Sequence, residues 1–574
     1  MPQIAFDRYY KYAEFTELLK AYVREYPEFV ELSSIGKSHE GRDIWLVTVT
    51  NKETGAAKDK PAFWCDATIH ASELSPGTAV LYLLNQLCVK HGIDESITRA
   101  VDTRAFYLVP RFNPDGAEWA MEDPPRIIRS STRPYPYDED DLYGIERQDV
   151  DGDGKILTMR VKDPNGAWKV AEEEPRMLKR REPHDTGGTY YRLFPEGLFH
   201  NFDGMVMKGR KIKEGLDLNR NFPSAWRQEN EQFGAGPYPT SEPEVRAIVQ
   251  AIVDRPNICA AITFHTFSGV HLRPPSRYPD DQMAPEDLWA YNDFGKKGTE
   301  LTGYPAISNY HEFRYHPKET ITGVFDDWMY EHRGAFAWTT EIWSPQKQAG
   351  ITEYKYIDWF RDHPFSDDIT LLKWSDEKLS GKGYVPWYPF EHPQLGQVEL
   401  GGWDVHHCFR NPPAEFLEAE VAPFTDWVVW LTNATPKLEL RACEVTPLPG
   451  GDKTVPATFR IRFAVQNTGY LPTNVTKVAV ERKLCRGVIG EIKMQGGIRD
   501  GLGKSAPVWL HAGKLREDAG QLVGWHHVSA SGFGWQMNST DDVAVFEWVV
   551  SPGTYELTAK HERAGTVKTT VVVG

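Results

Sequence analysis

The sequence predicts a mixed, mostly parallel α/β sheet flanked by helices and followed by a C-terminal all-β sandwich. Two observations support this fold class. Over the first 345 residues, short β-branched and aromatic runs alternate with stretches of helical periodicity, which is typical of a mainly parallel sheet. From about residue 437, short alternating runs are separated by Gly, Pro and Asn turns, which is typical of a small sandwich. A chain of 574 residues is long enough for both.

The elements of the first part follow from the spacing of apolar residues. Residues 7–30 place apolar side chains at helical spacing and end near Pro27, which predicts an amphipathic helix. The segment 76–89 predicts another helix. Short apolar runs predict strands over 43–51, 61–70, 103–113, 258–267 and 335–343. The ligand crevice of such a sheet lies outside the carboxyl ends of its strands, so polar residues that follow these runs are candidates for a site.

Two further segments set the domain organisation. Residues 117–214 are rich in Pro, Gly and charge, which indicates a long insertion carried on the α/β body. Residues 346–436 contain the helix-like run AEFLEAEVAPFTDWVVWLT and are expected to pack on that body as an extension. The chain is therefore divided into a first domain of residues 1–436 and a sandwich of residues 437–574. The strands expected in the sandwich are 459–467, 475–484, 543–550, 554–561 and 566–573.

Composition excludes several classes of partner. The chain has 65 Lys and Arg against 81 Asp and Glu, a net charge of -16, which argues against a surface for nucleic acid or for acidic membranes. The six cysteines are scattered without a CxxC pair, so we expect buried thiols rather than a disulfide framework. The N-terminus lacks a basic region followed by an apolar stretch, and the longest apolar runs are too short to span a bilayer. We therefore expect a cytoplasmic protein.

Three residues that follow strand-like runs have the chemistry of a metal site. His70 and Glu73 have two residues between them in IHASEL, where a turn can aim an imidazole nitrogen and a carboxylate at one point. His265 in AITFHTFSG ends another such run. Two imidazoles and a carboxylate with one open position suit a catalytic Zn²⁺. The alternatives are a surface turn for the first pair and a hydrogen-bonded core residue for His265.

Several segments, taken together and in order, resemble the zinc carboxypeptidase family, which includes carboxypeptidases A and B. The resemblance covers about residues 7–345, and it rests on EFVELSSIGKSHEGRDIWLVTVT, HASE, FNPDG, GLDLNRNFP, FHTFSG and DDWMYEHRGAFAWTTEIW. It implies an eight-stranded sheet and a Zn²⁺ ion held by His70, Glu73 and His265. It also implies a metallocarboxypeptidase that removes the C-terminal residue of a peptide with a free C-terminus.

The resemblance assigns roles to four further residues. Glu341 matches the family's catalytic glutamate, a general base that takes a proton from the attacking water. Asn219 and Arg220 match the residues that bind the substrate's terminal carboxylate, for which a planar guanidinium is suited. Asp217 matches the carboxylate that accepts the second ring N–H of a ligand histidine and fixes its tautomer.

Other assignments leave alternatives open. The arginine that stabilises the oxyanion is assigned to Arg129, with Arg126 and Arg133 as competitors. The tyrosine that closes over the substrate is assigned to Tyr315, with Tyr310 as the alternative, and either requires a local insertion relative to the family. Asp326 matches the residue at the base of the pocket for the last side chain of the substrate. A carboxylate there favours C-terminal Lys or Arg, unless the local insertion shifts the register and makes Asp326 structural. The family's digestive members carry an arginine where this chain has Ser72, so that contact is missing or supplied elsewhere.

An aspartate-rich loop within the insertion predicts a second metal site. Asp149, Asp151 and Asp153, followed by Gly154, have the spacing of the first half of an EF-hand loop, whose oxygens suit Ca²⁺. The twelfth position is Arg160 rather than Glu, and no helix precedes the loop. The alternative is a plain loop of Asx turns.

Two other functions on the same scaffold stay open. One is a carboxypeptidase-like binding module without activity, and retention of the ligands, the base and Arg220 argues against it. The other is a cell-wall amidase or side-chain deglutamylase, against which Asp326 and the lack of a leader argue. The sandwich could steady the α/β body, restrict entry to small peptides or mediate a homo-oligomer.

Overall fold

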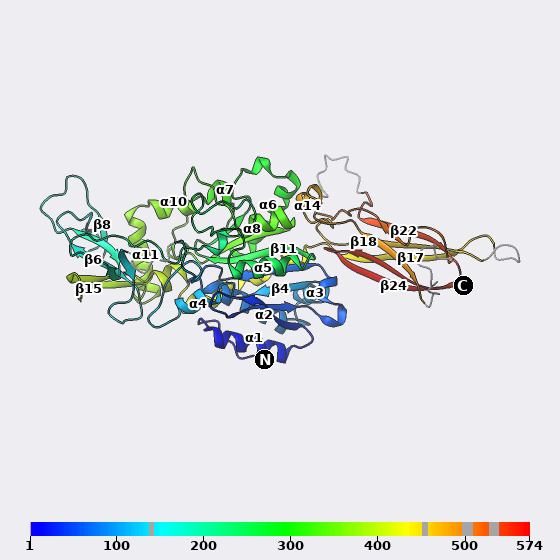
Figure 1. Ribbon diagram of the computed structural model, residues 1–574, viewed down its shortest axis with the longest axis horizontal. Coiled ribbons are helices and arrows are strands. Elements are labelled where there is room, and N and C mark those ends of the chain that lie inside the picture. The colour runs from blue at the N-terminus through cyan, green and yellow to red at the C-terminus, as the bar shows by residue number, and fades with distance from the viewer. Residues whose placement is uncertain (1, 137–142, 451–456, 496–508, 527–538) are drawn as a thin grey trace.

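The computed structural model describes residues 2–136, 143–450, 457–495, 509–526 and 539–574. The molecule is elongated (Figure 1). A central α/β body lies between a β-rich lobe that contains β6, β8 and β15 at one end and the C-terminal strands at the other. The N-terminus lies on the α/β body and the C-terminus on the C-terminal strands.

The body is built on an eight-stranded sheet, which confirms the predicted mixed, mostly parallel fold class. Its order is β1-β2-β4-β3-β11-β14-β12-β13. The four central strands β4, β3, β11 and β14 are mutually parallel, and antiparallel pairs lie toward both edges. The strands are β1 (Val30–Lys37), β2 (Asp43–Val49), β3 (Ala62–Ala67), β4 (Ala105–Val109), β11 (Ile258–Thr266), β12 (Val270–Arg273), β13 (Ala306–Ser308) and β14 (Phe336–Ile342).

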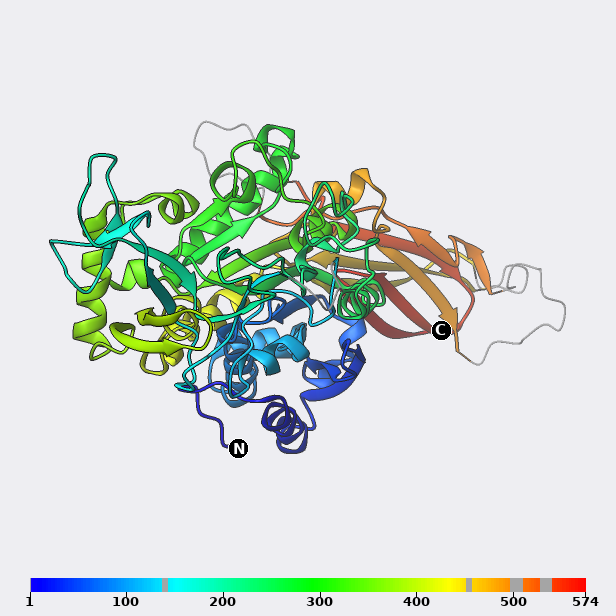
Figure 2. The same ribbon diagram turned by 60° about the vertical axis from the view of Figure 1, so that its left-hand side comes forward.

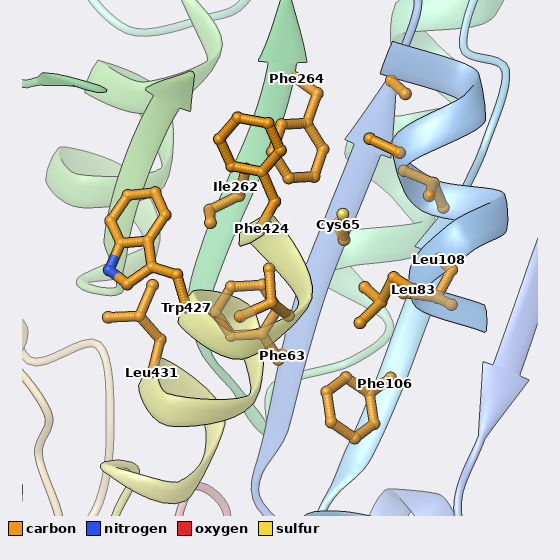
Figure 3. Close-up of a cluster of buried hydrophobic side chains, with 14 of the residues drawn as sticks. Phe63, Cys65, Leu83, Phe106, Leu108, Ile262, Phe264, Phe424, Trp427 and Leu431 are labelled. Carbon is orange, nitrogen blue, oxygen red and sulfur yellow. The ribbon is translucent and has the colours of Figure 1, made fainter. Parts of the chain in front are cut away.

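Apolar residues on both faces of the sheet bury two separate cores. Along β3, Phe63 and Cys65 enter one core while Ala62 and Trp64 enter the other, as the alternation of side chains along a strand requires. Figure 3 shows Phe63 and Cys65 together with residues of the helix α13. The first core is covered by α1 (Tyr12–Glu25), α2 (Ser75–Val89), α3 (Glu95–Thr103), α6 (Pro285–Thr302), α12 (Ala414–Val421) and α13 (Pro423–Asn433). The second is covered by α5 (Pro243–Val253) and α8 (Phe325–Trp328).

The first helix is shorter than the sequence predicted. The apolar spacing suggested a helix over residues 7–30, but α1 spans Tyr12–Glu25 and β1 begins at Val30. Pro27 lies in the turn between them, where its ring prevents the helix from continuing.

The insertion and the extension together form a second sheet. Its order is β15-β16-β6-β9-β7-β8, with β6 and β16 as antiparallel neighbours. The insertion supplies β6 (Thr158–Lys162), β7 (Trp168–Val170), β8 (Leu178–Arg180) and β9 (Tyr191–Pro195), and the extension supplies β15 (Tyr384–His392) and β16 (Gly396–Trp403). The insertion also forms a separate hairpin of β5 (Gly144–Arg147) and β10 (Gly197–His200). Figure 2 shows this lobe beside the α/β body.

The C-terminal part consists of two four-stranded antiparallel sheets around one apolar core. Four of the strands expected there are present. The sheets contain β17 (Leu438–Pro447), β18 (Phe459–Asn467), β19 (Ile489–Met494), β20 (Leu510–Ala512), β21 (Arg516–Asp518), β22 (Val543–Val550), β23 (Gly553–His561) and β24 (Gly565–Val573).

The prediction of a strand over 475–484 was wrong, because this segment forms the short helix α14 (Lys477–Glu481). The Thr476 hydroxyl accepts a hydrogen bond from the backbone N–H of Ala479 and caps the helix. Asp287 of α6 accepts the backbone N–H groups of Lys477 and Val478. These caps at the junction with the α/β body outweigh the β-propensity of the valines.

Candidate metal centre

The three expected zinc ligands meet at the carboxyl ends of two neighbouring parallel strands. His70 and Glu73 lie in the turn after β3, and His265 lies near the end of β11. The Nδ1 atoms of the two histidines are 3.0 Å apart. Glu73 Oε1 lies 2.9 Å from His70 Nδ1, and Glu73 Oε2 lies 3.3 Å from His265 Nδ1. All three side chains are at most 2% exposed.

The second nitrogen of each imidazole has a hydrogen-bond acceptor. His70 Nε2 lies 3.2 Å from Asp217 Oδ1. His265 Nε2 lies 3.3 Å from the Thr263 hydroxyl, which donates its own proton to Asp66. Both Nε2 atoms therefore carry the ring proton, and both Nδ1 lone pairs point at the Glu73 carboxylate.

This donor set fits a zinc ion. The two imidazole lone pairs and the carboxylate converge on a common point, at about the length of a metal–ligand bond. Groups arranged in this way repel each other unless a cation lies among them. Burial also lowers the pKa of His265 to about 4, which keeps the ring neutral and able to coordinate. His70, Glu73 and His265 would hold the ion.

Asp217 connects the ligands to two arginines. The Arg129 side chain donates to Asp217 Oδ2 at 3.0 Å and lies 3.6 Å from Glu73 Oε1. Arg220 lies 3.8 Å from the same Asp217 oxygen. Although burial opposes it, the positive charges of Arg129 and Arg220 hold the pKa of Asp217 well below its usual range. Asp217 is thus an anion that can accept the His70 ring proton.

The two alternatives to Arg129 as the oxyanion-stabilising arginine are paired with carboxylates elsewhere. Arg126 forms an ion pair with Glu122, and Arg133 forms one with Glu242. Only Arg129 of the three lines the cavity that contains His70 and His265.

Glu341 lies in β14, directly opposite His265 in the paired register of β11 and β14. It lines the same cavity, and its buried Oε2 atom has no hydrogen-bond partner among the described residues. Burial and the nearby charge of Glu73 raise the pKa of Glu341 well above the usual value. A carboxyl group with a raised pKa holds a proton more readily than an exposed glutamate does, as a general base must once it has accepted one.

The expected substrate-binding residues line this cavity, which has a volume of about 40 Å³. Arg220 donates to the backbone carbonyl of Asn219, and the Asn219 side chain accepts the backbone N–H of Phe325. Tyr315 is 49% exposed at the rim, while Tyr310 is not among the lining residues.

Asp326 lines the cavity and is 2% exposed. It accepts a hydrogen bond of 2.8 Å from the Asn309 side chain and has no ion-pair partner among the described residues. Burial raises the pKa of its carboxyl. An uncompensated carboxyl in a pocket of this kind suits a basic side chain.

Two residues of the extension lie at the centre although no sequence pattern indicated them. Arg410 donates to the Ser72 hydroxyl at 3.1 Å. Asn411 is fully buried, accepts the backbone N–H groups of Leu74 and Ser75, and donates to the Ser72 carbonyl. The extension therefore holds the chain on both sides of the expected ligand Glu73.

The aspartate-rich loop brings its three carboxylates together. Oxygens of Asp149, Asp151 and Asp153 lie within 4.8 Å of one another. Asp149 accepts the backbone N–H groups of Gly152 and Gly154, as in an Asx turn. The side chain at the twelfth loop position, Arg160, pairs with Glu399 of β16 and does not take part in the loop.

Comparison with known proteins identifies the class of the chain. The family model described as zinc carboxypeptidase matches residues 15–358, so the chain belongs to the zinc carboxypeptidase family. A domain of unknown function matches residues 437–572. No helix among the described residues has the length and apolar character needed to cross a bilayer.

Individual relatives are distant. Human carboxypeptidase D is 32% identical over 119 residues, which is 21% of this chain and 9% of that protein. Carboxypeptidase B of Astacus astacus is 24% identical over 345 residues, 58% of this chain and 86% of that protein. The solved structure of thrombin activatable fibrinolysis inhibitor covers 74% of each chain at 17% identity and a TM-score of 0.43. The chain spans only 9% of the length of the first curated relatives that it matches.

Proposed function

We propose that the protein is a zinc-dependent metallocarboxypeptidase that hydrolyses the C-terminal peptide bond of its substrate. One observation carries this proposal. The two histidine Nδ1 lone pairs and the Glu73 carboxylate converge in a buried cavity that also contains Glu341, whose inner oxygen has no partner. Membership of the zinc carboxypeptidase family supports it.

Each residue of the site has a separate role in hydrolysis. When bound, Zn²⁺ would supply Lewis acidity toward the scissile carbonyl and lower the pKa of a water molecule. Glu341 accepts the proton of the attacking water and passes it to the leaving amine, for which its raised pKa is suited. Arg129 donates hydrogen bonds to the oxyanion that develops on the carbonyl. Asp217 keeps the His70 proton on Nε2 throughout.

Recognition of the substrate follows from the same cavity. Arg220 and Asn219 bind the terminal carboxylate, and Tyr315 covers the bound residue from the rim. Asp326 receives the last side chain and favours Lys or Arg, which its lack of a cationic partner supports.

Hydrolysis of a peptide panel with varied C-terminal residues tests this function. We expect release of the C-terminal residue, loss of activity on chelation and its return with Zn²⁺. Glu341→Gln keeps the size of the side chain but cannot act as the base, so we expect at least about a thousandfold loss of kcat. Glu391→Gln, on β15 in the second sheet, is the matched control. Activity that survives chelation or Glu341→Gln would exclude the mechanism.

The two alternatives give different outcomes with the same protein. A binding module without activity would bind peptides and Zn²⁺ but release no residue from any substrate. An amidase or deglutamylase would act on branched or γ-linked peptides and leave linear peptides with C-terminal Lys intact.

We also propose that the loop of Asp149, Asp151 and Asp153 binds Ca²⁺, on the basis of its spacing and the proximity of its carboxylates. Calorimetric titration with CaCl₂ tests this, with Asp151→Asn as the variant. The absence of heat at millimolar Ca²⁺ would leave the loop as a set of Asx turns.

The domain boundary near residue 437 and a role of the sandwich in homo-oligomers also stand as proposals. Light scattering of the whole chain and of residues 1–436 would test both at once. The shorter chain should stay folded and lose any self-association.

A further inference from the structure

A large cavity adjoins the proposed active site on the side of the insertion. Its volume is about 830 Å³. It lies between the α/β body and segments that the insertion contributes, including β5 and residues 209–215. Arg129 and Arg220 line both this cavity and the one that contains the proposed zinc ligands. The two spaces therefore meet at the guanidinium groups that we assign to substrate binding.

The lining of this cavity is strongly cationic. Among the described residues, seven arginines and lysines line it against three acidic residues, Glu146, Glu214 and Asp217. Two of these acids are already paired: Glu146 with Arg210, and Asp217 with Arg129. The chain as a whole carries a net charge of -16, so the positive charge of this cavity has the opposite sign to that of the whole protein.

Two cations of the lining are left without a counter-ion. Arg147 of β5 and Lys213 form no ion pair with the described residues. Arg410, from the extension, lies near Arg147 and Arg129 and likewise has no carboxylate in ion-pair contact among the described residues. Arg410 thus adds a third positive charge beside Arg129 and Arg147, while the carboxylates of Glu73 and Glu341 also act on it. Such a cluster is stabilised by an anionic ligand.

The direction of the substrate indicates which part of it would reach these cations. In the proposed function, the C-terminal residue occupies the small cavity lined by Asp326, and the scissile carbonyl lies at Arg129. The next space beyond Arg129 is the large cavity. Residues on the amino-terminal side of the scissile bond can therefore enter it.

We propose that this cavity is a binding site for acidic side chains of the peptide substrate, on the amino-terminal side of the scissile bond, with Arg147 and Lys213 as the binding cations. This inference rests on the proposed peptidase function. It describes an enzyme that selects peptides by an acidic segment as well as by their last residue.

Peptides that differ only upstream test the inference. Hexapeptides keep one C-terminal dipeptide that the enzyme cleaves well, and three positions before it are Glu, Ala or Lys. We expect kcat/KM to rise by about fivefold to tenfold from Ala to Glu and to fall for Lys. The advantage of Glu should decline between 50 mM and 500 mM salt, because exposed charges are screened.

Matched variants assign the effect to the cavity. Arg147→Gln/Lys213→Gln should remove most of the Glu advantage and leave the Ala peptide within about twofold. Lys162→Gln/Arg180→Gln removes the same charge from exposed positions of β6 and β8 and should preserve the advantage. Equal rates for Glu and Ala peptides in the unaltered enzyme would overturn the inference, while cleavage of the Ala peptide would leave the peptidase function standing.

Binding separates the inference from hydrolysis. Fluorescence anisotropy of labelled Glu and Ala peptides with Glu341→Gln should show tighter binding of the Glu peptide even if no peptide is hydrolysed. The acidic residues 138–141, which lie outside the described residues, are a competing anion within the chain. If Glu peptides bind better only after these four are changed to Asn or Gln, the inference for the native enzyme is wrong.

Discussion

Replacement of Asn411 by Ala tests whether the extension is part of the zinc centre. The Asn411 side chain makes four hydrogen bonds: it accepts from Leu74 N and Ser75 N, and it donates to the carbonyls of Ser72 and His406. Alanine leaves these groups buried without their partner, and each such loss costs about 1 kcal/mol or more. We expect the free energy of unfolding to fall by about 3–5 kcal/mol.

The same substitution should weaken zinc binding, because Ser72 and Leu74 flank the ligand Glu73. Loss of a group that orients a metal ligand lowers affinity by about 10–100-fold. Competition with a chelating dye measures the affinity, and urea unfolding measures stability. Asn433→Ala, which removes two hydrogen bonds to Ser96 far from the centre, is the control. The reasoning is refuted if Asn411→Ala binds Zn²⁺ as tightly as Asn433→Ala does.

Three further predictions concern separate parts of the molecule. Asp326→Asn should lower kcat/KM for a C-terminal Lys by about 10–100-fold and spare a C-terminal Leu; equal losses on both would contradict the pocket assignment. Burial raises the pKa of Glu244 to about 7, so its stabilising contribution is present at low pH and is lost as pH rises from its unfolded value of about 4.5 toward 7. Urea unfolding of Glu244→Gln should therefore show a gain of about 2–3 kcal/mol over the unaltered protein between pH 5 and pH 8, whereas a constant difference would exclude the shift. Asp287→Ala removes the acidic cap of α14 and should make the C-terminal sandwich separate earlier in limited proteolysis; an unchanged cleavage rate would contradict this role of Asp287.

The residues of the candidate site that could be predicted from the sequence lie at the ends of strands. His70, His265 and Glu341 follow or end short apolar runs, and the parallel arrangement of β3, β11 and β14 brings such positions to one edge of the sheet. Short motifs therefore indicated both the residue types of the candidate site and their position at the edge of the sheet.

Contacts between distant segments were not predictable in this way. Arg410 and Asn411 follow Ser72 by more than 330 residues, and nothing in the run HHCFRNPP indicates a partner. The helix α14 was mistaken for a strand because its valines favour β structure, while the acidic cap that decides the outcome comes from Asp287. Pairing of the insertion with the extension likewise depends on register between segments that have no shared sequence signal.

The second sheet limits how far the chain can be shortened. Strands β6 and β16 are neighbours, yet four strands of the α/β sheet, β11 to β14, lie between them in sequence. A chain cut at residue 358, where the family match ends, would lose β15 and β16 and leave β6 as an open edge. It would also lose the segment that holds Glu73 in place. The smallest stable form of the protein therefore extends through α13, and the end of the family match is not a suitable place to truncate the chain.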